Sequence, residues 1–445
     1  MVPMLIGLIY FLAQRKQERE IDNNDAYRYY TKAIMFKVLG GLSLAVVYAF
    51  YYGGGDTINY WMDAGYLGAM FFEHTICAFK ILFGDFSVSN YFFCWDFGVK
   101  PMYYLKDPQS FTVARMVAFP YLFTIKAFFG CTILVSWIAF GGVWRLYTVF
   151  VEEYPTLKRE MAMCVLFIPS VTFWGSGILK DTFTFSAVCW MTYAVYKLLI
   201  KRTDIVWSLL YLIVSSWMLL TIKPYIFVAL LPGTFLWAIF RQINSVENIL
   251  VRVLIAPIIL MIGAVGVGFV FSQASDSLGD YGSVDTMLNK AVVTQTDLKQ
   301  EYYGGQTFDI GSFDASIGGI LSKAPIAIYS GLFRPMLWEV GSIFMLVTAI
   351  ENTIILLFFL FMVLKVGPIK YFTGTLAEPM SMFGFVFSIF FAFSVGLTTA
   401  NFGSLVRYKI PAVPFFLASI YIARDRSTRD SEDYIVTEEE TSQLT

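Results

Sequence analysis

Charged residues are scarce in this sequence of 445 residues: Lys, Arg, Asp and Glu make up 15% of it, whereas hydrophobic residues make up 57%. This composition excludes an ordinary soluble globular domain. Several apolar stretches are long enough to cross a bilayer, so we predict an all-α, polytopic transmembrane helical bundle. The net charge of −1 says nothing about nucleic acid, but no basic tract points to such a partner and we expect none.

Histidine and cysteine are scarce as well. The single histidine, His74, excludes a His-based metal cluster or relay and argues against zinc chemistry, and we interpret it as a loop residue. No cofactor is indicated, and a divalent cation stays open. Cys77 and Cys94 share one loop and can pair if that loop is oxidised, although the sequence fixes no geometry. The other three cysteines lie in apolar runs, where a small buried side chain is the default: Cys131, Cys164 and Cys189.

Hydropathy and the distribution of Lys and Arg predict the topology. Residues 1–33 should form a short N-terminal helix, not a signal peptide, followed by a basic cytoplasmic segment. Residues 34–423 should form the membrane domain, with external segments 53–116 and 272–340, and the acidic tail 424–445 should be disordered and cytoplasmic. We expect interfacial helices within 63–83 and 92–104. About eleven membrane segments are predicted, with approximate bounds 34–50, 117–149, 161–174, 182–200, 205–220, 226–240, 253–271, 320–330, 343–364, 380–397 and 410–422.

This orientation places several charged residues at the outer ends of predicted spans. Charges at membrane depth usually face a cavity or a partner, and outer cations run against the positive-inside trend. A group of cations with a few acids on one face suggests a site for an anionic ligand with an acid–base residue. The group consists of Asp56, Lys180, Asp181, Lys223, Arg334, Glu339, Arg407 and Lys409.

Asp56 is the acid in this group that the sequence singles out. It follows Gly53-Gly54-Gly55, where the backbone can turn with positive φ, and it precedes Tyr60 and Trp61. Its position at the end of an apolar run suits either a solvated helix-cap residue or a reactive carboxylate. Both interpretations stay open from the sequence.

The cations also have ordinary structural explanations. Lys180 and Asp181 can pair with each other, and Lys223 before Pro224 can be a snorkelling lysine. Arg334 can anchor at the interface beside Trp338, in a local ion pair with Glu339. Arg407 and Lys409 can bind lipid phosphate, and Glu351 can make a buried polar contact instead of acting in a relay. The argument therefore depends on the group and not on any single residue.

A lipid-linked sugar donor is a ligand that such a group would suit. Its one or two phosphates lie at the membrane surface, where Arg and Lys would bind them and stabilise the leaving group. A nearby carboxylate would act as general base towards an acceptor hydroxyl. Exposed aromatic side chains could stack on sugar rings, and we name Trp61, Trp95, Tyr302 and Tyr303 for this role.

The pattern resembles the glycosyltransferase C superfamily of integral membrane enzymes. The similarity rests on Asp56 within Gly53-Gly54-Gly55-Asp56-Thr57-Ile58-Asn59-Tyr60, after the first outward span. Three further motifs are similar to bacterial members and to polysaccharide polymerases: Ile168-Pro169-Ser170 with Phe173-Trp174, Gly177-Ile178-Leu179-Lys180-Asp181, and Arg407-Tyr408-Lys409 before Pro411 and Pro414. The resemblance implies that Asp56 is the general base and that Lys180, Arg334 and Arg407 contact the donor phosphate.

Two features depart from that family. An additional short helix precedes the usual first span, and no second Asp adjoins Asp56 to bind a metal, since Asp63 is the nearest acid.

Our leading hypothesis is a glycosyltransferase of a bacterial inner membrane that uses a polyprenyl-linked donor and a glycan or protein acceptor on the outer face. Asp56 would be catalytic, with Lys180, Lys223, Arg334, Arg407 and Lys409 on the phosphate and Tyr60, Asp181, Trp338 and Glu339 in support. The alternatives are a polysaccharide polymerase or ligase using a lipid diphosphate, a transporter or flippase, and a non-catalytic subunit of an envelope assembly machine. The sequence names no sugar, acceptor or oligomeric state.

Overall fold

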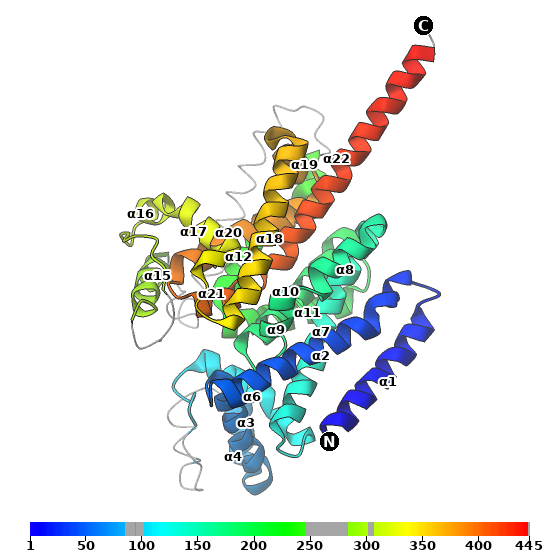
Figure 1. The fold of residues 1–445 in the computed structure, drawn as a ribbon. Coiled ribbons are helices and arrows are strands. Elements are labelled where there is room, and N and C mark those ends of the chain that lie inside the picture. Colours follow the sequence, from blue (N-terminus) through cyan, green and yellow to red (C-terminus); the bar gives the residue numbers. More distant parts are fainter. Residues whose placement is uncertain (85–93, 95–101, 245–283, 301–306, 444–445) are drawn as a thin grey trace. The chain divides into compact units, whose positions relative to one another are not determined.

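The computed structural model describes residues 1–84, 94, 102–244, 284–300 and 307–443. Over this part the chain is helical, and the one β-bridge is an isolated antiparallel pairing of Thr307 with Asn401. The chain divides into two compact units, which we describe separately (Figure 1). Unit 1 comprises Met1–Val149, Leu166–Leu198 and Thr203–Pro224, and unit 2 comprises Phe150–Val165, Leu199–Arg202 and Tyr225–Thr445.

Unit 1 contains the long N-terminal helices and the segment that carries Asp56. Helix α3 packs against α4 and α6, α10 packs against α11, and α2 packs against α1 and α9. A cluster of buried apolar side chains on α3, α4, α6 and α7 forms the core beneath the start of α3. The elements that begin in this unit are α1 (Val2–Glu20), η1 (Asp25–Tyr29), α2 (Tyr30–Val46), η2 (Val47–Tyr51), α3 (Asp56–Glu73), α4 (Thr75–Phe83), α6 (Pro108–Phe123), α7 (Phe128–Glu153), α9 (Pro169–Trp174), α10 (Lys180–Val195), η4 (Tyr196–Lys201) and α11 (Ile205–Ile222).

Unit 2 contains the C-terminal helices. Helix α20 packs against α17 and α22, and α19 packs against both α20 and α22. Phenylalanine rings lie between α20 and α22, where Phe383 and Phe387 each meet Phe415 edge to face. The elements are η3 (Pro155–Leu157), α8 (Lys158–Leu166), α12 (Pro224–Asn244), α15 (Val284–Asp297), α16 (Ile317–Ser322), α17 (Ala324–Phe333), η7 (Leu337–Glu339), α18 (Ile343–Val366), α19 (Pro368–Ala377), α20 (Pro379–Thr398), α21 (Phe402–Tyr408) and α22 (Ala412–Gln443).

Helices α17 and α20 approach each other backbone to backbone. A Cβ atom added at Gly331 on α17 would overlap the carbonyl oxygen of Ala392, and one added at Gly396 on α20 would overlap the carbonyl oxygen of Ala327. Each helix therefore offers a glycine where the other presents main chain. Small residues at helix crossings permit this close contact in membrane proteins.

Six helices in the described residues have the length and hydropathy of a membrane span, or seven if Phe402–Tyr408 and Ala412–Ser427, which meet at a bend of 60°, count as one. The chain thus has the helices of a multi-pass membrane protein. The predicted total of about eleven is not confirmed, and the predicted span 253–271 lies outside the described residues. The six helices are Asp25–Tyr51, Phe128–Glu153, Lys180–Lys201, Ile205–Ile222, Met345–Val366 and Pro379–Thr398.

Two predicted spans were wrong as continuous helices. The stretch 117–149 is divided between α6 and α7 by a break in which Ile125 and Lys126 have positive φ, at 49° and 64°. The stretch 161–174 is divided between α8 and α9 because Pro169 disfavours helical geometry at Ile168, whose ψ is 121°. The segments predicted at 226–240 and 320–330 correspond to shorter apolar helices, Pro224–Phe240 and Ala324–Phe333.

The two ends of the chain are both helical where the structure describes them. The predicted N-terminal helix is present and extends further than expected, as α1 from Val2 to Glu20. At the other end α22 runs from Ala412 to Gln443, and the disorder that we expected for the acidic segment after residue 424 stays a prediction.

The segment predicted as external, 53–116, is mostly helical where described, with non-helical backbone at 53–55 and 102–107. Helices α3 and α4 cover the predicted interfacial region 63–83, with a break at His74, and most of the second region, 92–104, lies outside the described residues. Neither α3 nor α4 is among the candidate spans. Cys77 on α4 forms a disulfide with Cys94, as the sequence allowed, and the other three cysteines are free and buried.

Candidate functional site

The start of α3 positions Asp56. Gly53, Gly54 and Gly55 have φ values of 65°, 156° and 106°, which residues with side chains rarely adopt, and the helix begins directly after them. Asp56 is therefore in the first turn of α3, where the helix dipole stabilises a negative charge. Its side chain is half-buried.

Tyr104 lies against Asp56. The Tyr104 hydroxyl donates a 2.9 Å hydrogen bond to Asp56 Oδ1, and the Asn59 side chain also hydrogen bonds this hydroxyl. Burial, together with the neighbouring Asp56 charge, raises the pKa of Tyr104 far above its usual value. The phenol thus remains protonated and serves Asp56 as a hydrogen-bond donor.

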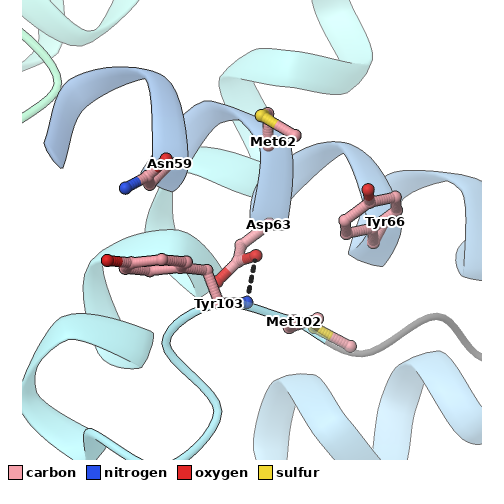
Figure 2. Close-up of a pocket in the computed structure, with 6 residues that line it drawn as sticks. All are labelled: Asn59, Met62, Asp63, Tyr66, Met102 and Tyr103. Atoms are coloured by element: carbon pink, nitrogen blue, oxygen red, sulfur yellow. Dashed lines mark hydrogen bonds between the residues drawn. The ribbon is translucent and has the colours of Figure 1, made fainter. Parts of the chain in front are cut away.

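Asp63 fixes the loop that carries Tyr104. Its two carboxylate oxygens accept hydrogen bonds from the backbone N–H groups of Tyr103 and Tyr104, both at 2.8 Å, and Figure 2 shows the first of these. The side chain is 1% exposed. Burial raises the pKa of Asp63, although the two N–H bonds oppose the shift. Asp63 is the nearest acid to Asp56 in the sequence. It therefore positions Tyr104, whose hydroxyl in turn hydrogen bonds Asp56.

A ring stack followed by polar contacts leads from Tyr104 to Lys180. The Tyr104 ring stacks on Tyr60, with centroids 4.5 Å apart, and the Tyr60 hydroxyl donates to Ser110 Oγ at 3.4 Å. Ser110 Oγ donates in turn to Asp107 Oδ2, and Lys180 Nζ lies 3.4 Å from that same oxygen. We call these residues the Asp56 cluster; its members are Asp56, Tyr60, Tyr104, Asp107, Ser110 and Lys180.

Burial acts most strongly on the charge of Lys180, and three acids oppose it: Asp107 contributes most among them, followed by Asp56 and Asp181. Burial would raise the pKa of Asp107, but the Lys180 charge and the hydrogen bonds from Ser110 outweigh it and lower the pKa. The Lys180 side chain is 19% exposed and that of Asp107 is 48% exposed, so solvent reaches this ion pair mainly from the Asp107 side. The cluster thus combines a half-buried carboxylate with a partly exposed ammonium group.

Asp181 and Lys223 form a separate pair in unit 1. Lys223 Nζ lies 2.5 Å from Asp181 Oδ1, and the two side chains are 8% and 2% exposed. The pair joins the first turn of α10 to Lys223, the residue that directly follows α11. This contact accounts for Lys223 without a bound phosphate, because removal of either partner would leave a buried charge.

An open pocket of ≈ 290 Å³ adjoins the Asp56 cluster (Figure 2). Asn59, which hydrogen bonds the Tyr104 hydroxyl, lies at its edge, and the pocket follows one face of α3 to the loop at Tyr103. Its lining comprises Asn59, Met62, Asp63, Tyr66, Met102 and Tyr103.

Unit 2 holds the remaining predicted site residues, grouped around Arg334. Arg334 Nε donates to Glu339 Oε1 at 2.8 Å, a second guanidinium nitrogen contacts the same oxygen, and Glu339 Oε2 accepts from the backbone N–H of Met336. The guanidinium also lies over the rings of Phe308 and Phe402, at 4.6 and 5.2 Å from their centroids. The local ion pair that the sequence suggested is therefore present.

Lys409 is 1% exposed and supports the turn after α17. Its ammonium group donates to the carbonyl oxygens of Leu332 and Arg334, at 2.8 and 3.2 Å, and to Asn352 Oδ1 at 2.5 Å. The Glu351 charge also acts on it. All three of its protons have acceptors within the protein, so these contacts explain Lys409 without a lipid phosphate.

The structure also describes three further residues that the sequence analysis named: Arg407, Trp338 and Trp61. Arg407 is in the last turn of α21, 5.9 Å from the Tyr408 ring centroid, and Trp338 is 75% exposed. Trp61, predicted to stack on sugar, instead packs against the rings of Tyr121 and Phe128. Three aromatic residues predicted for the same role lie outside the described residues: Trp95, Tyr302 and Tyr303.

The sequence analysis missed three members of the Asp56 cluster: Tyr104, Asp107 and Ser110. A signal for one of them exists in Asp107-Pro108, since Asp before a proline at the first helical position is a helix-start pattern. Asp107 does cap α6, accepting from the N–H groups of Gln109 and Ser110 at 3.1 and 3.2 Å.

In the described part of the chain, no group of three or more His, Cys, Asp or Glu side chains is arranged to hold a metal ion. The question of a divalent cation at the site, which the sequence left open, is not decided by this arrangement. No family model, curated protein or solved structure matches this chain.

Proposed function

We propose that this chain is an integral membrane glycosyltransferase that moves a sugar from a polyprenyl-phosphate-linked donor to a hydroxyl group of a glycan or protein acceptor. The observation that carries the proposal is the Asp56 cluster, in which hydrogen bonds, one ring stack and an ion pair join a half-buried carboxylate to the partly exposed ammonium group of Lys180. Sugar transfer from a phosphate requires both a base and a cation.

In the proposed reaction the acceptor hydroxyl oxygen attacks the anomeric carbon of the donor sugar. The bond from that carbon to the phosphate oxygen breaks, its electron pair stays on the phosphate, and the hydroxyl proton passes to Asp56. The Tyr104 hydroxyl keeps the Asp56 carboxylate oriented through Oδ1. Lys180 stabilises the charge that develops on the leaving phosphate.

Contacts within the two units favour Lys180 over Lys223, Arg334 and Lys409 as a phosphate ligand. Lys223 and Lys409 are buried with acceptors of their own, and Arg334 is paired with Glu339 and stacked on two rings. Lys180 has more exposed surface than Lys223 and a longer separation from its partner, 3.4 Å compared with 2.5 Å. A phosphate oxygen can replace Asp107 on Lys180 at less cost than it can break a buried pair.

The disulfide supports an extracytoplasmic location for the segment that carries Asp56. Disulfides persist in oxidising compartments such as the periplasm and are rare in the cytosol. Cys77 and Cys94 lie between Asp56 and Tyr104 in the sequence, so the base and its partner would be on the side of the membrane where this bond is stable. That side matches the outer face of a bacterial cytoplasmic membrane, with a cytoplasmic C-terminus.

The test uses purified full-length protein in nanodiscs with a panel of radiolabelled polyprenyl-phosphate and polyprenyl-diphosphate sugars. We expect wild-type protein to bind a lipid-linked sugar and transfer it, and Asp56→Asn to bind it equally but to transfer at least about a hundred times more slowly. Glu73→Gln, which changes an exposed acid at the far end of the same helix, is the matched control and should behave as wild type.

Each other outcome of this test has a definite meaning. Binding of diphosphate donors alone favours the polymerase or ligase alternative. In sealed vesicles that contain the purified protein, movement of the lipid-linked sugar across the bilayer without transfer favours a flippase. Full transfer activity in Asp56→Asn would refute the base assignment.

A further inference from the structure

The pocket beside the Asp56 cluster has no role in the reaction as described so far. Its polar contribution comes from Asn59 and Asp63, and its remaining lining consists of two tyrosines and two methionines. Its lining, as the structure describes it, contains neither Lys nor Arg. A phosphate group is therefore a poor occupant, because it would meet the Asp63 carboxylate and no cation. The donor phosphate belongs at Lys180 and not here.

The pocket offers an aromatic platform with an amide beside it. Tyr103 is 72% exposed, and Figure 2 shows the Asn59 side chain on the side of the pocket where the Tyr103 ring lies. Asn supplies both hydrogen-bond donors and an acceptor, whereas the ring and the methionines offer apolar surface. A sugar ring matches this combination, since it presents C–H groups on its faces and hydroxyls at its edge.

The alternative of a lipid chain fits less well. Helix α3 is not among the candidate spans, and the buried Asp63 carboxylate borders the pocket. A volume of ≈ 290 Å³ is at the small end of ligand pockets and is suited to one sugar residue, not to a long chain.

The position of the pocket relates its occupant to Asp56. Asn59 lies three residues after Asp56 on α3, so the two side chains occupy the same face one turn apart. Asn59 also bonds the Tyr104 hydroxyl that donates to Asp56. A sugar on Tyr103 and Asn59 would therefore have its edge next to the base.

We propose that this pocket binds the terminal sugar of the acceptor, with Tyr103 as the stacking platform and Asn59 as the hydrogen-bonding residue that directs one hydroxyl towards Asp56. The acceptor is thus a saccharide and not a protein side chain. The role of this sugar as the acceptor rests on the proposed function. Binding of a saccharide to the pocket does not, and it can be measured without any transfer.

The first experiment measures binding by saturation-transfer difference NMR to full-length protein in nanodiscs. The probes are the methyl glycosides of glucose, galactose, N-acetylglucosamine and rhamnose. We expect at least one to bind wild-type protein and Tyr103→Phe, which retains the ring, and to bind Tyr103→Ala and Asn59→Ala about tenfold more weakly. Tyr10→Ala, which removes an exposed tyrosine of α1, is the matched control and should bind as wild type.

Thermal unfolding of each variant checks that it is folded. Failure of all four glycosides to bind wild-type protein, or equal binding by Tyr103→Ala, would overturn the pocket assignment.

The second experiment separates this proposal from the proposed function. With the lipid-linked donor and a saccharide acceptor, Tyr103→Ala should raise the acceptor KM about tenfold and leave donor binding unchanged. Transfer that depends on Asp56 but not on Tyr103 overturns only the pocket assignment. Glycoside binding that depends on Tyr103, with neither donor binding nor transfer, overturns only the glycosyltransferase proposal.

Discussion

Lys180 in unit 1 and Lys409 in unit 2 both lie at helix ends, and both were predicted to hold a donor phosphate. Lys409 is buried and gives its three protons to two carbonyl oxygens and an amide oxygen. Lys180 is partly exposed, and its neighbours are carboxylates. The same residue type therefore supports a turn in one unit and is available to a ligand in the other, and the difference is determined by the acceptors around it.

The largest effect should come from Lys409→Met. The change leaves two buried acceptors and one part-buried acceptor without Lys409, and each buried one costs about 1 kcal/mol or more, so the free energy of unfolding should fall by at least about 2 kcal/mol. Thermal unfolding in detergent measures it, with Lys365→Met, at the exposed end of α18, as control. Equal free energies of unfolding for Lys409→Met and Lys365→Met would mean that Lys409 does not support the turn.

Lys180→Met should show the opposite pattern. Because its ion pair with Asp107 is long, at 3.4 Å, and Asp107 is 48% exposed, the free energy of unfolding should change by only about 1 kcal/mol. Donor affinity, in contrast, should fall at least about tenfold, since the phosphate loses a charged hydrogen-bond donor. Lys106→Met, a neighbouring exposed lysine, is the control for donor binding. Unchanged donor affinity in Lys180→Met would end its assignment to the phosphate.

Tyr104→Phe tests whether the Tyr104 hydroxyl orients Asp56 in unit 1. It removes the hydroxyl that donates to Asp56 and retains the ring that stacks on Tyr60. We expect kcat to fall by about tenfold to a hundredfold, the value of one hydrogen bond to a charged group, with little change in the acceptor KM. Steady-state kinetics beside Tyr10→Phe tests this, and a change confined to KM would argue against an orienting role.

The smallest effect concerns pH. The lowered pKa of Asp107 means that its contribution to stability is present above the ordinary pKa of Asp, about 3.9, and is lost as the pH falls through the lowered value. Asp107→Asn retains a helix-capping side chain but removes the charge. The difference in melting temperature between wild type and this variant should therefore be largest at neutral pH and disappear in acid. If the difference in melting temperature persisted unchanged in acid, it would contradict a stabilising charge interaction between Asp107 and Lys180.

Much of the fold could be predicted because it depends on local sequence. The glycines before Asp56 and the apolar run before them correctly indicated a helix, a turn and an acid at the start of the next helix. Hydropathy alone could not locate the break between α6 and α7. The break is formed by Ile125 and Lys126, which adopt positive φ although neither is a glycine.

The site was predictable only in part because its contacts join distant residues. Tyr104 and Asp56 are 48 residues apart, and Lys409 contacts carbonyl groups 77 and 75 residues away. A residue pattern shows that a cation lies at a helix end, but it does not show whether its neighbours are carboxylates, carbonyls or solvent. That distinction separated Lys180 from Lys409.

The glycine contact between α17 and α20 constrains the order of biosynthesis. Helix α17 has 10 residues, and a helix rises 1.5 Å per residue, so it is about half as long as a bilayer core of about 30 Å. It cannot be inserted as an independent span, and its docking surface includes Gly396 and Ala392 on α20. The ribosome must therefore synthesise the chain beyond Gly396 before α17 can reach its final position, which makes this part of unit 2 one of the last to assemble.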